Sequence, residues 1–140
     1  MIKATKKATK SLIRWLKAEG QEGIETPQTE EATFRLDFGD LEVGTLELRA
    51  GVWEFRYSDT FRHQVGTEGG VRPLIDFPDV SKPYRSDELW PFFMARIPSP
   101  AQPRILAEIT RRGIDRTSTL DLLRAFGEWS IANPFRLHAA

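Results

Sequence analysis

The stretch KPYRSDELWPFFMARIPSP, Lys82–Pro100, is the densest apolar segment of the chain and is bounded by prolines. It predicts one short helix, because Ser86 and the two acids that follow it suit an N-cap and a first turn. Pro91 is compatible with this helix only in the first turn, where its missing N–H would have no partner anyway. The helix must end before Pro98. We expect the other elements to be arranged around it.

The apolar side chains of this helix cover more than one face. At about 100° per residue, Trp90 and Met94 widen the apolar arc to about 200°, although a stripe of about 100° is enough to dock a surface helix. The excess is either buried on a second side within the same domain, or left as a Trp90/Met94 edge that contacts another protein. The remaining apolar residues, which share one side, are Leu89, Phe92, Phe93 and Ile97.

Composition limits the possible classes of protein. A chain of 140 residues suits one domain that buries roughly two-thirds of its unfolded surface. It contains no cysteine, which excludes disulfides, thiolate metal sites and cysteine nucleophiles. Twenty basic and twenty acidic side chains balance, so net charge gives no reason to expect nucleic acid or membrane binding. Without a long apolar run or a signal peptide, the chain is expected in the cytoplasm.

The charges are unevenly placed at the start of the chain. Residues 1–18 carry six cations and no acid, and their apolar residues suit a helix whose firm part is Ser11–Ala18. Gly20–Thr33 then carries four glutamates, two glycines and a proline without a convincing period, which is typical of a linker. We therefore expect residues 1–31 to be a basic helix plus an acidic linker. The cations are Lys3, Lys6, Lys7, Lys10, Arg14 and Lys17.

From Ala32 the apolar pattern changes to a period of two. Phe34–Phe38, Val43–Leu48 and Val52–Tyr57 alternate apolar and polar residues and are separated by Gly-containing turns, which predicts a three-stranded antiparallel meander. Pro73–Phe77 can add one more strand. The intervening residues 59–72 hold three glycines and few large apolar side chains, so we expect a loop.

After Pro103 the pattern is helical again. One helix is expected to end at Gly113, and a second, capped by Ser118 or Thr119, to end at Gly127. Residues 128–140 are too short for a domain but apolar enough to lie against the body as an arm. The resulting fold class is α+β, with residues 32–127 as the domain. In this class the strands come first along the chain and the helices after them.

The sequence offers little chemistry. His63 and His138 have neither a metal-ligand spacing nor an obvious acid–base neighbour along the chain. Gly69-Gly70 lacks the surrounding frame of a nucleotide-binding loop, and Asp76 and Asp79 lack a metal-loop spacing. We therefore expect a protein that is not an enzyme and uses no cofactor and no metal.

Three segments, LEVGTLELRAGVWEFRYSDTF, RPLIDFPDV and KPYRSDELWPFFMARIPSP, resemble the N-terminal subdomain of HipA-type serine/threonine kinases. In that family a VGxL strand, an FxY strand, a Pro-bounded strand and a PxFFxxLLPEG-like helix occur in this order. The resemblance extends over about residues 32–127, including TLDLLRAFG near its end. It implies a small antiparallel β-sheet or partly closed barrel with packed helices. This chain departs from the pattern with RIPSP in place of LLPEG. The kinase core that follows in those proteins is missing, so kinase activity is not expected.

A free-standing copy of this subdomain is similar to the small HipS component of HipBST-type toxin–antitoxin systems. The resemblance implies a non-catalytic antitoxin or regulator that binds and restrains a HipA/HipT-like kinase toxin in a bacterial cytoplasm. A HipB-like DNA-binding protein is a further partner of such systems. An inhibitor needs an anchor rather than chemistry, and an aromatic on a rigid helix suits that role. The expected partner-binding residues are Trp90, Met94, Arg96 and Pro98.

Two other classes of function stay open. A nucleic-acid-binding accessory protein would act through the cations of residues 1–18, although the neighbouring acids compete for those side chains. A self-associating scaffold would use the same fold to bind a second copy. Steep salt dependence of nucleic-acid binding would indicate the first, and a dimer that persists without an added partner would indicate the second.

Overall fold

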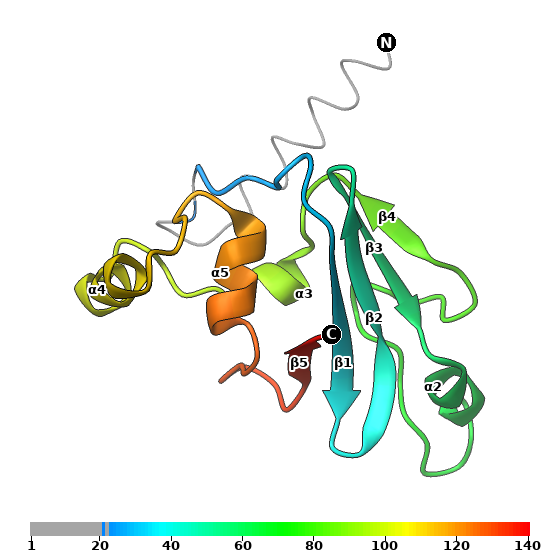
Figure 1. Ribbon diagram of the computed structural model, residues 1–140. Helices are drawn as coiled ribbons and strands as arrows, with labels where there is room; N and C mark the ends of the chain where they lie inside the picture. The colour runs from blue at the N-terminus through cyan, green and yellow to red at the C-terminus, as the bar shows by residue number, and fades with distance from the viewer. Residues whose placement is uncertain (1–20, 22) are drawn as a thin grey trace.

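The computed structural model describes residue 21 and residues 23–140, which form a five-stranded antiparallel sheet with four helices (Figure 1). The strand order is β4-β3-β2-β1-β5, and the sheet is open rather than closed into a barrel. This is the expected α+β class. The strands are β1 (Ala32–Phe38), β2 (Leu41–Arg49), β3 (Val52–Tyr57), β4 (Tyr84–Ser86) and β5 (Arg136–Ala139). The helices are α2 (Asp59–Gln64), α3 (Pro91–Met94), α4 (Pro103–Arg112) and α5 (Thr119–Phe126).

The meander β1–β2–β3 is confirmed with the predicted inward face. Phe34 pairs with Leu46, and Leu46 pairs with Phe55, so one row of large apolar side chains crosses the three strands. All three are buried. The β2–β3 turn places Ala50 and Gly51 at φ of 51° and 76°, as a type I′ turn requires.

Helices α3, α4 and α5 lie on one side of the sheet, and α2 lies apart from them at the end of β3 (Figure 1). In Figure 1, α3 and α5 lie against this face, and α4 lies beyond α5. Gly44 allows close packing on this face, because a Cβ atom there would lie 2.8 Å from the ring of Phe55 and 2.4 Å from the carbonyl oxygen of Arg56. The opposite face carries ion pairs instead, including one in which Glu54 binds both Arg56 and Arg85.

The predicted strand Pro73–Phe77 is wrong, and the fourth strand is β4. The Tyr57 hydroxyl donates to the carbonyl oxygen of Phe77 at 2.6 Å and accepts from the N–H of Leu74 at 2.9 Å, which holds residues 74–77 in a turn. Burial raises the pKa of Tyr57 to about 12. Phe77 thereby enters the core fully, although its backbone pairs with no strand.

The expected loop of residues 59–72 contains α2. Ser58 caps this helix by accepting a hydrogen bond from the N–H of Phe61 at 3.0 Å, and Phe61 is buried with its ring 4.9 Å from that of Tyr57. The sequence pattern did not predict this helix, because Phe61 is its single buried apolar residue. One side chain gives no detectable period.

Helix α3 is shorter than predicted and begins later. Its N-cap is Trp90, with no side-chain capping bond, and Pro91 occupies the first helical position. Ser86 belongs instead to β4, where it pairs with Trp53 of β3. Strand pairing therefore holds Ser86, which the sequence pattern assigned to the helix cap.

Helices α4 and α5 confirm the sequence pattern. Gly113 ends α4 in the left-handed conformation at φ 66°. Ser118 caps α5 by accepting a hydrogen bond from the N–H of Asp121 at 3.2 Å. The first helix is mostly exposed and buries Ile109, whereas the second inserts Leu120, Leu122 and Leu123 into the core.

Part of the expected linker packs against the domain, whereas residues 28–31 are exposed. Ile24 is 2% exposed, and Thr26 accepts a hydrogen bond from the indole Nε1–H of Trp53 at 2.9 Å. The backbone of Glu25 bonds to Thr117 and Thr119 at the start of α5. Gln21, Ile24 and Thr26 are therefore held by the domain, which the sequence pattern did not predict. The basic residues 1–18 lie outside the described residues.

The expected apolar arm contributes the edge strand β5. Leu137 is buried and lies opposite Leu36 of β1, so the second half of the arm lies against the body. The first half differs, because Trp129 is 62% exposed and Ile131 is fully exposed.

Candidate functional site

Trp90 stands where the chain enters α3. Its carbonyl oxygen accepts hydrogen bonds from the N–H groups of Phe93 at 3.0 Å and Met94 at 2.9 Å. Pro91 follows it at the first helical position, where its fixed φ favours the turn. The indole ring is half-buried. Backbone bonds and a proline thus fix the position of an aromatic side chain that keeps accessible surface.

A cluster of aromatic rings supports Trp90 from the core side. Phe77 is at the centre of this cluster, and its ring centroid lies 5.0 Å from that of Trp90, edge to face at 81°. The same ring lies 4.5 Å from Phe55, 5.2 Å from Tyr84 and 6.0 Å from Phe93. Such contacts restrict the rotamers of Trp90, so it loses little side-chain entropy when a partner binds.

Met94 and Arg96, two of the predicted partner-binding residues, are buried in the isolated chain. They are 5% and 3% exposed. Pro98, the fourth predicted residue, is half-buried like Trp90. In this conformation Trp90 and Pro98 can therefore be touched from outside, whereas Met94 and Arg96 support the site from within.

The Arg96 guanidinium binds the chain that follows α5. It donates to the carbonyl oxygens of Gly127 at 2.6 Å, Glu128 at 2.9 Å and Phe135 at 2.6 Å, and to Oδ1 of Asn133 at 3.3 Å. These acceptors are neutral, and burial lowers the pKa of Arg96 below its ordinary value. Arg96 thus joins the end of α3 to both ends of the segment that leads into β5.

Gln21 fixes the other side of the same turn. Its side-chain N–H groups donate to the carbonyl oxygens of Met94 at 3.2 Å and Ile97 at 2.6 Å, at the end of a short helix where backbone acceptors lack helical partners. The Met94 oxygen also accepts from the N–H of Ile97. The chain preceding β1 therefore meets the end of α3 directly. Sequence analysis missed this contact, because a single polar residue in an acidic segment carries no pattern.

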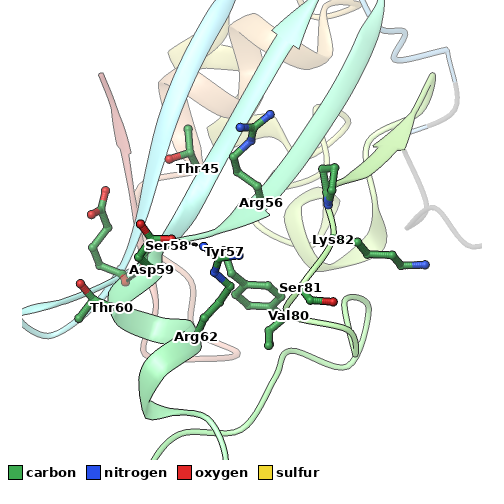
Figure 2. Close-up of a pocket in the computed structure, with 12 residues that line it drawn as sticks. Thr45, Arg56, Tyr57, Ser58, Asp59, Thr60, Arg62, Val80, Ser81 and Lys82 are labelled. Carbon is green, nitrogen blue, oxygen red and sulfur yellow. Dashed lines mark hydrogen bonds and ion pairs between the residues drawn. The ribbon is translucent and has the colours of Figure 1, made fainter.

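A polar cleft of about 590 Å³ lies on the opposite side of the sheet, beside the end of β3. Figure 2 shows its three cations, which come from separate elements: Arg56 on β3, Arg62 on α2 and Lys82 on the loop before β4. Arg56 pairs with Glu54 at 3.1 Å, and Arg62 pairs with Asp59. The Lys82 ammonium lies 5.0 Å from the Tyr84 ring. Because of these internal contacts, the cleft surface is solvated and its positive and negative charges nearly cancel.

One of the two histidines has a neighbour that the sequence did not reveal. Nε2 of His138 lies 2.9 Å from Oδ2 of Asp37, which Arg35 also binds at 3.0 Å. The expectation that His138 lacks an acidic neighbour is wrong. Strands β1 and β5 are about a hundred residues apart in the sequence, and their pairing brings His138 next to Asp37. Within residues 21 and 23–140, no group of three or more His, Asp or Glu could hold a metal ion.

The family model of the HipA N-terminal domain matches residues 36–131. The chain belongs to this family. The match begins within β1 and runs past α5, so it includes Trp90, the aromatic cluster and Arg96. A comparison with curated proteins returned no match.

Membership of the HipA N-terminal domain family indicates a HipA-related toxin–antitoxin context, and the matched module is the N-terminal domain rather than a kinase domain. The VGxL motif of the resemblance has a physical explanation in this domain. Its glycine is Gly44, where the ring of Phe55 occupies the space that a Cβ atom would need. In the part of the chain that the structure describes, no helix is long and apolar enough to cross a membrane.

Proposed function

We propose that this chain is a non-catalytic module that binds a HipA/HipT-like serine/threonine kinase and restrains it. The family match over residues 36–131 carries the proposal. The geometry at α3 supports it, because a binding protein needs a fixed, accessible side chain and not a reactive one. A HipB-like DNA-binding protein in the same bacterial cytoplasm would complete the system.

Trp90 is the anchor in this proposal, and Pro98 contacts the same partner from the other end of the α3 turn. The Trp90 ring is half-buried against Phe77, so a partner that covers its free side removes apolar surface at a small entropy cost. Met94 and Arg96 act indirectly, by filling the space under the turn and by holding the segment after α5.

Binding of the Trp90→Ala variant to a purified HipA-type kinase tests the proposal. We expect a loss of about 2 kcal/mol in binding, roughly thirtyfold in Kd, with the free variant still folded. Trp129→Ala is the matched control, since it removes an exposed tryptophan from a different segment. It should bind as the wild-type chain does.

Kinase activity measured with and without the chain tests restraint separately from binding. We expect phosphorylation by the kinase to fall in proportion to occupancy, and Trp90→Ala to require a higher concentration for the same effect. Wild-type binding and restraint by a folded Trp90→Ala variant would remove Trp90 as the anchor. A chain that binds no HipA-type kinase would refute the proposed function itself.

A further inference from the structure

Strand β5 is attached to the domain by contacts that another copy of the chain could supply equally well. Its backbone pairs with β1 from Phe34↔Ala139 to Asp37↔Arg136, and the N–H of Ala140 donates to Thr33 at 2.8 Å. Its side chains add the buried Leu137 and the His138–Asp37 pair. These groups belong to β5 and to its acceptor edge. Two further bonds tie β5 to the segment before it: the N–H of Leu137 donates to the carbonyl oxygen of Glu128 at 2.9 Å, and Arg136 pairs with the Glu128 carboxylate at 2.9 Å. A second copy would have to replace these two.

The segment 128–135 that leads from α5 to β5 has the properties of a hinge. It exposes two large apolar side chains, Trp129 and Ile131. Ile131 is fully exposed, whereas one face of the Trp129 ring lies 4.5 Å from the Arg136 guanidinium. Pro134 fixes its own φ and favours an extended conformation at Asn133, which disfavours a tight reversal. Arg96 opposes opening, because it binds both Glu128 at the start and Phe135 at the end of this segment.

We propose that β5 exchanges between two copies of this chain, so that the β1 edge of each copy receives β5 of the other. The exchanged dimer keeps the β1–β5 ladder, the Leu137 contact and the Arg96–Phe135 bond, but forms them between copies. The two hinges then run side by side and bury the apolar residues that are exposed in the closed form. Exchange requires the Arg96–Phe135 bond to break first, so it is slow and depends on concentration.

A cysteine pair across β1 and β5 tests this directly, because the chain has no native cysteine. Arg35 and His138 are Cα partners in the ladder, so Arg35→Cys/His138→Cys forms a disulfide within one chain when closed and between chains when exchanged. We expect the fraction of covalent dimer on a non-reducing gel to rise with the protein concentration during incubation before oxidation.

The matched control is Thr33→Cys/Glu47→Cys, which joins β1 to β2, two strands that stay together in both forms. It should give disulfides within one chain at every concentration. A β1–β5 disulfide that also stays within one chain at every concentration overturns the proposal.

Light scattering of the wild-type chain gives a second measurement if the Arg35→Cys/His138→Cys variant does not fold. We expect a dimer fraction that rises with concentration and is reduced by Ile131→Ser, with an unchanged melting temperature for the monomer because this side chain is fully exposed. A monomer at all concentrations, or a dimer unaffected by Ile131→Ser, contradicts exchange through this hinge.

Discussion

Replacing Arg96 by alanine should destabilise the domain strongly and locally. The guanidinium donates four hydrogen bonds, three of them to backbone carbonyls at the two ends of segment 127–135. Each bond from a charged donor is worth about 1.5–3 kcal/mol, but removing a buried charge also recovers its desolvation cost. We therefore expect a net loss of about 3–4 kcal/mol, which corresponds to roughly 10–15 °C in Tm for a domain of this size.

Denaturant unfolding and amide hydrogen exchange together measure this effect. Arg96→Ala should lower the free energy of unfolding and release the amides of β5 before those of β2 and β3, because β5 depends on the Arg96 contacts. Arg96→Lys, which keeps the charge but not the planar set of donors, should recover less than half of the loss. A loss below about 1 kcal/mol with unchanged β5 exchange would refute this role for Arg96.

Three further perturbations follow from the packing. Gly44→Ala should cost more than about 2 kcal/mol in unfolding experiments, because the added Cβ meets the Phe55 ring and a backbone carbonyl; a neutral effect would mean that the ring can move aside. Above pH 10 the unfolded phenol of Tyr57 ionises while the folded phenol stays protonated to about pH 12, so stability should fall by about 2–3 kcal/mol across that window. Alkaline melting curves that match those of Tyr57→Phe would contradict this. Ala50→Asn should raise stability by about 0.5–1 kcal/mol, since asparagine tolerates the positive φ of the β2–β3 turn better than alanine; a lower Tm would argue against it.

Local patterns predicted the elements that depend on local physics. The meander follows from alternation in Phe34–Phe38 and Val52–Tyr57, and α5 follows from its serine cap and leucine period. Gly113 ends α4 in the left-handed conformation that its position indicated. In each case the forces that form the element act between residues close in sequence, so the sequence shows them.

The contacts that complete the domain could not be predicted in this way. Thr26 accepts a hydrogen bond from Trp53, and Gln21 donates two to the end of α3, so both polar residues bind partners far away in the sequence. Neither Thr26 nor Gln21 stands in a periodic pattern. For the candidate site, the sequence placed Trp90 on the α3 turn but could not show that Met94 and Arg96 lie beneath it. The burial of Arg96 involves the segment after α5, which contacts its guanidinium from more than thirty residues away.

The separation of β5 from β1 along the chain has a consequence for the order of assembly during folding. β1, β2 and β3 follow one another through short turns, so their pairing closes small loops, whereas the β1–β5 ladder joins residue 34 to residue 139. Closing a loop of that length costs more conformational entropy. The contacts of β5 can offset this cost only after α5 has docked on the sheet. The meander is therefore expected to gain protection from hydrogen exchange first during refolding, and β5 last. A chain emerging from the ribosome would hold an uncovered β1 edge until residues 136–139 are made and released.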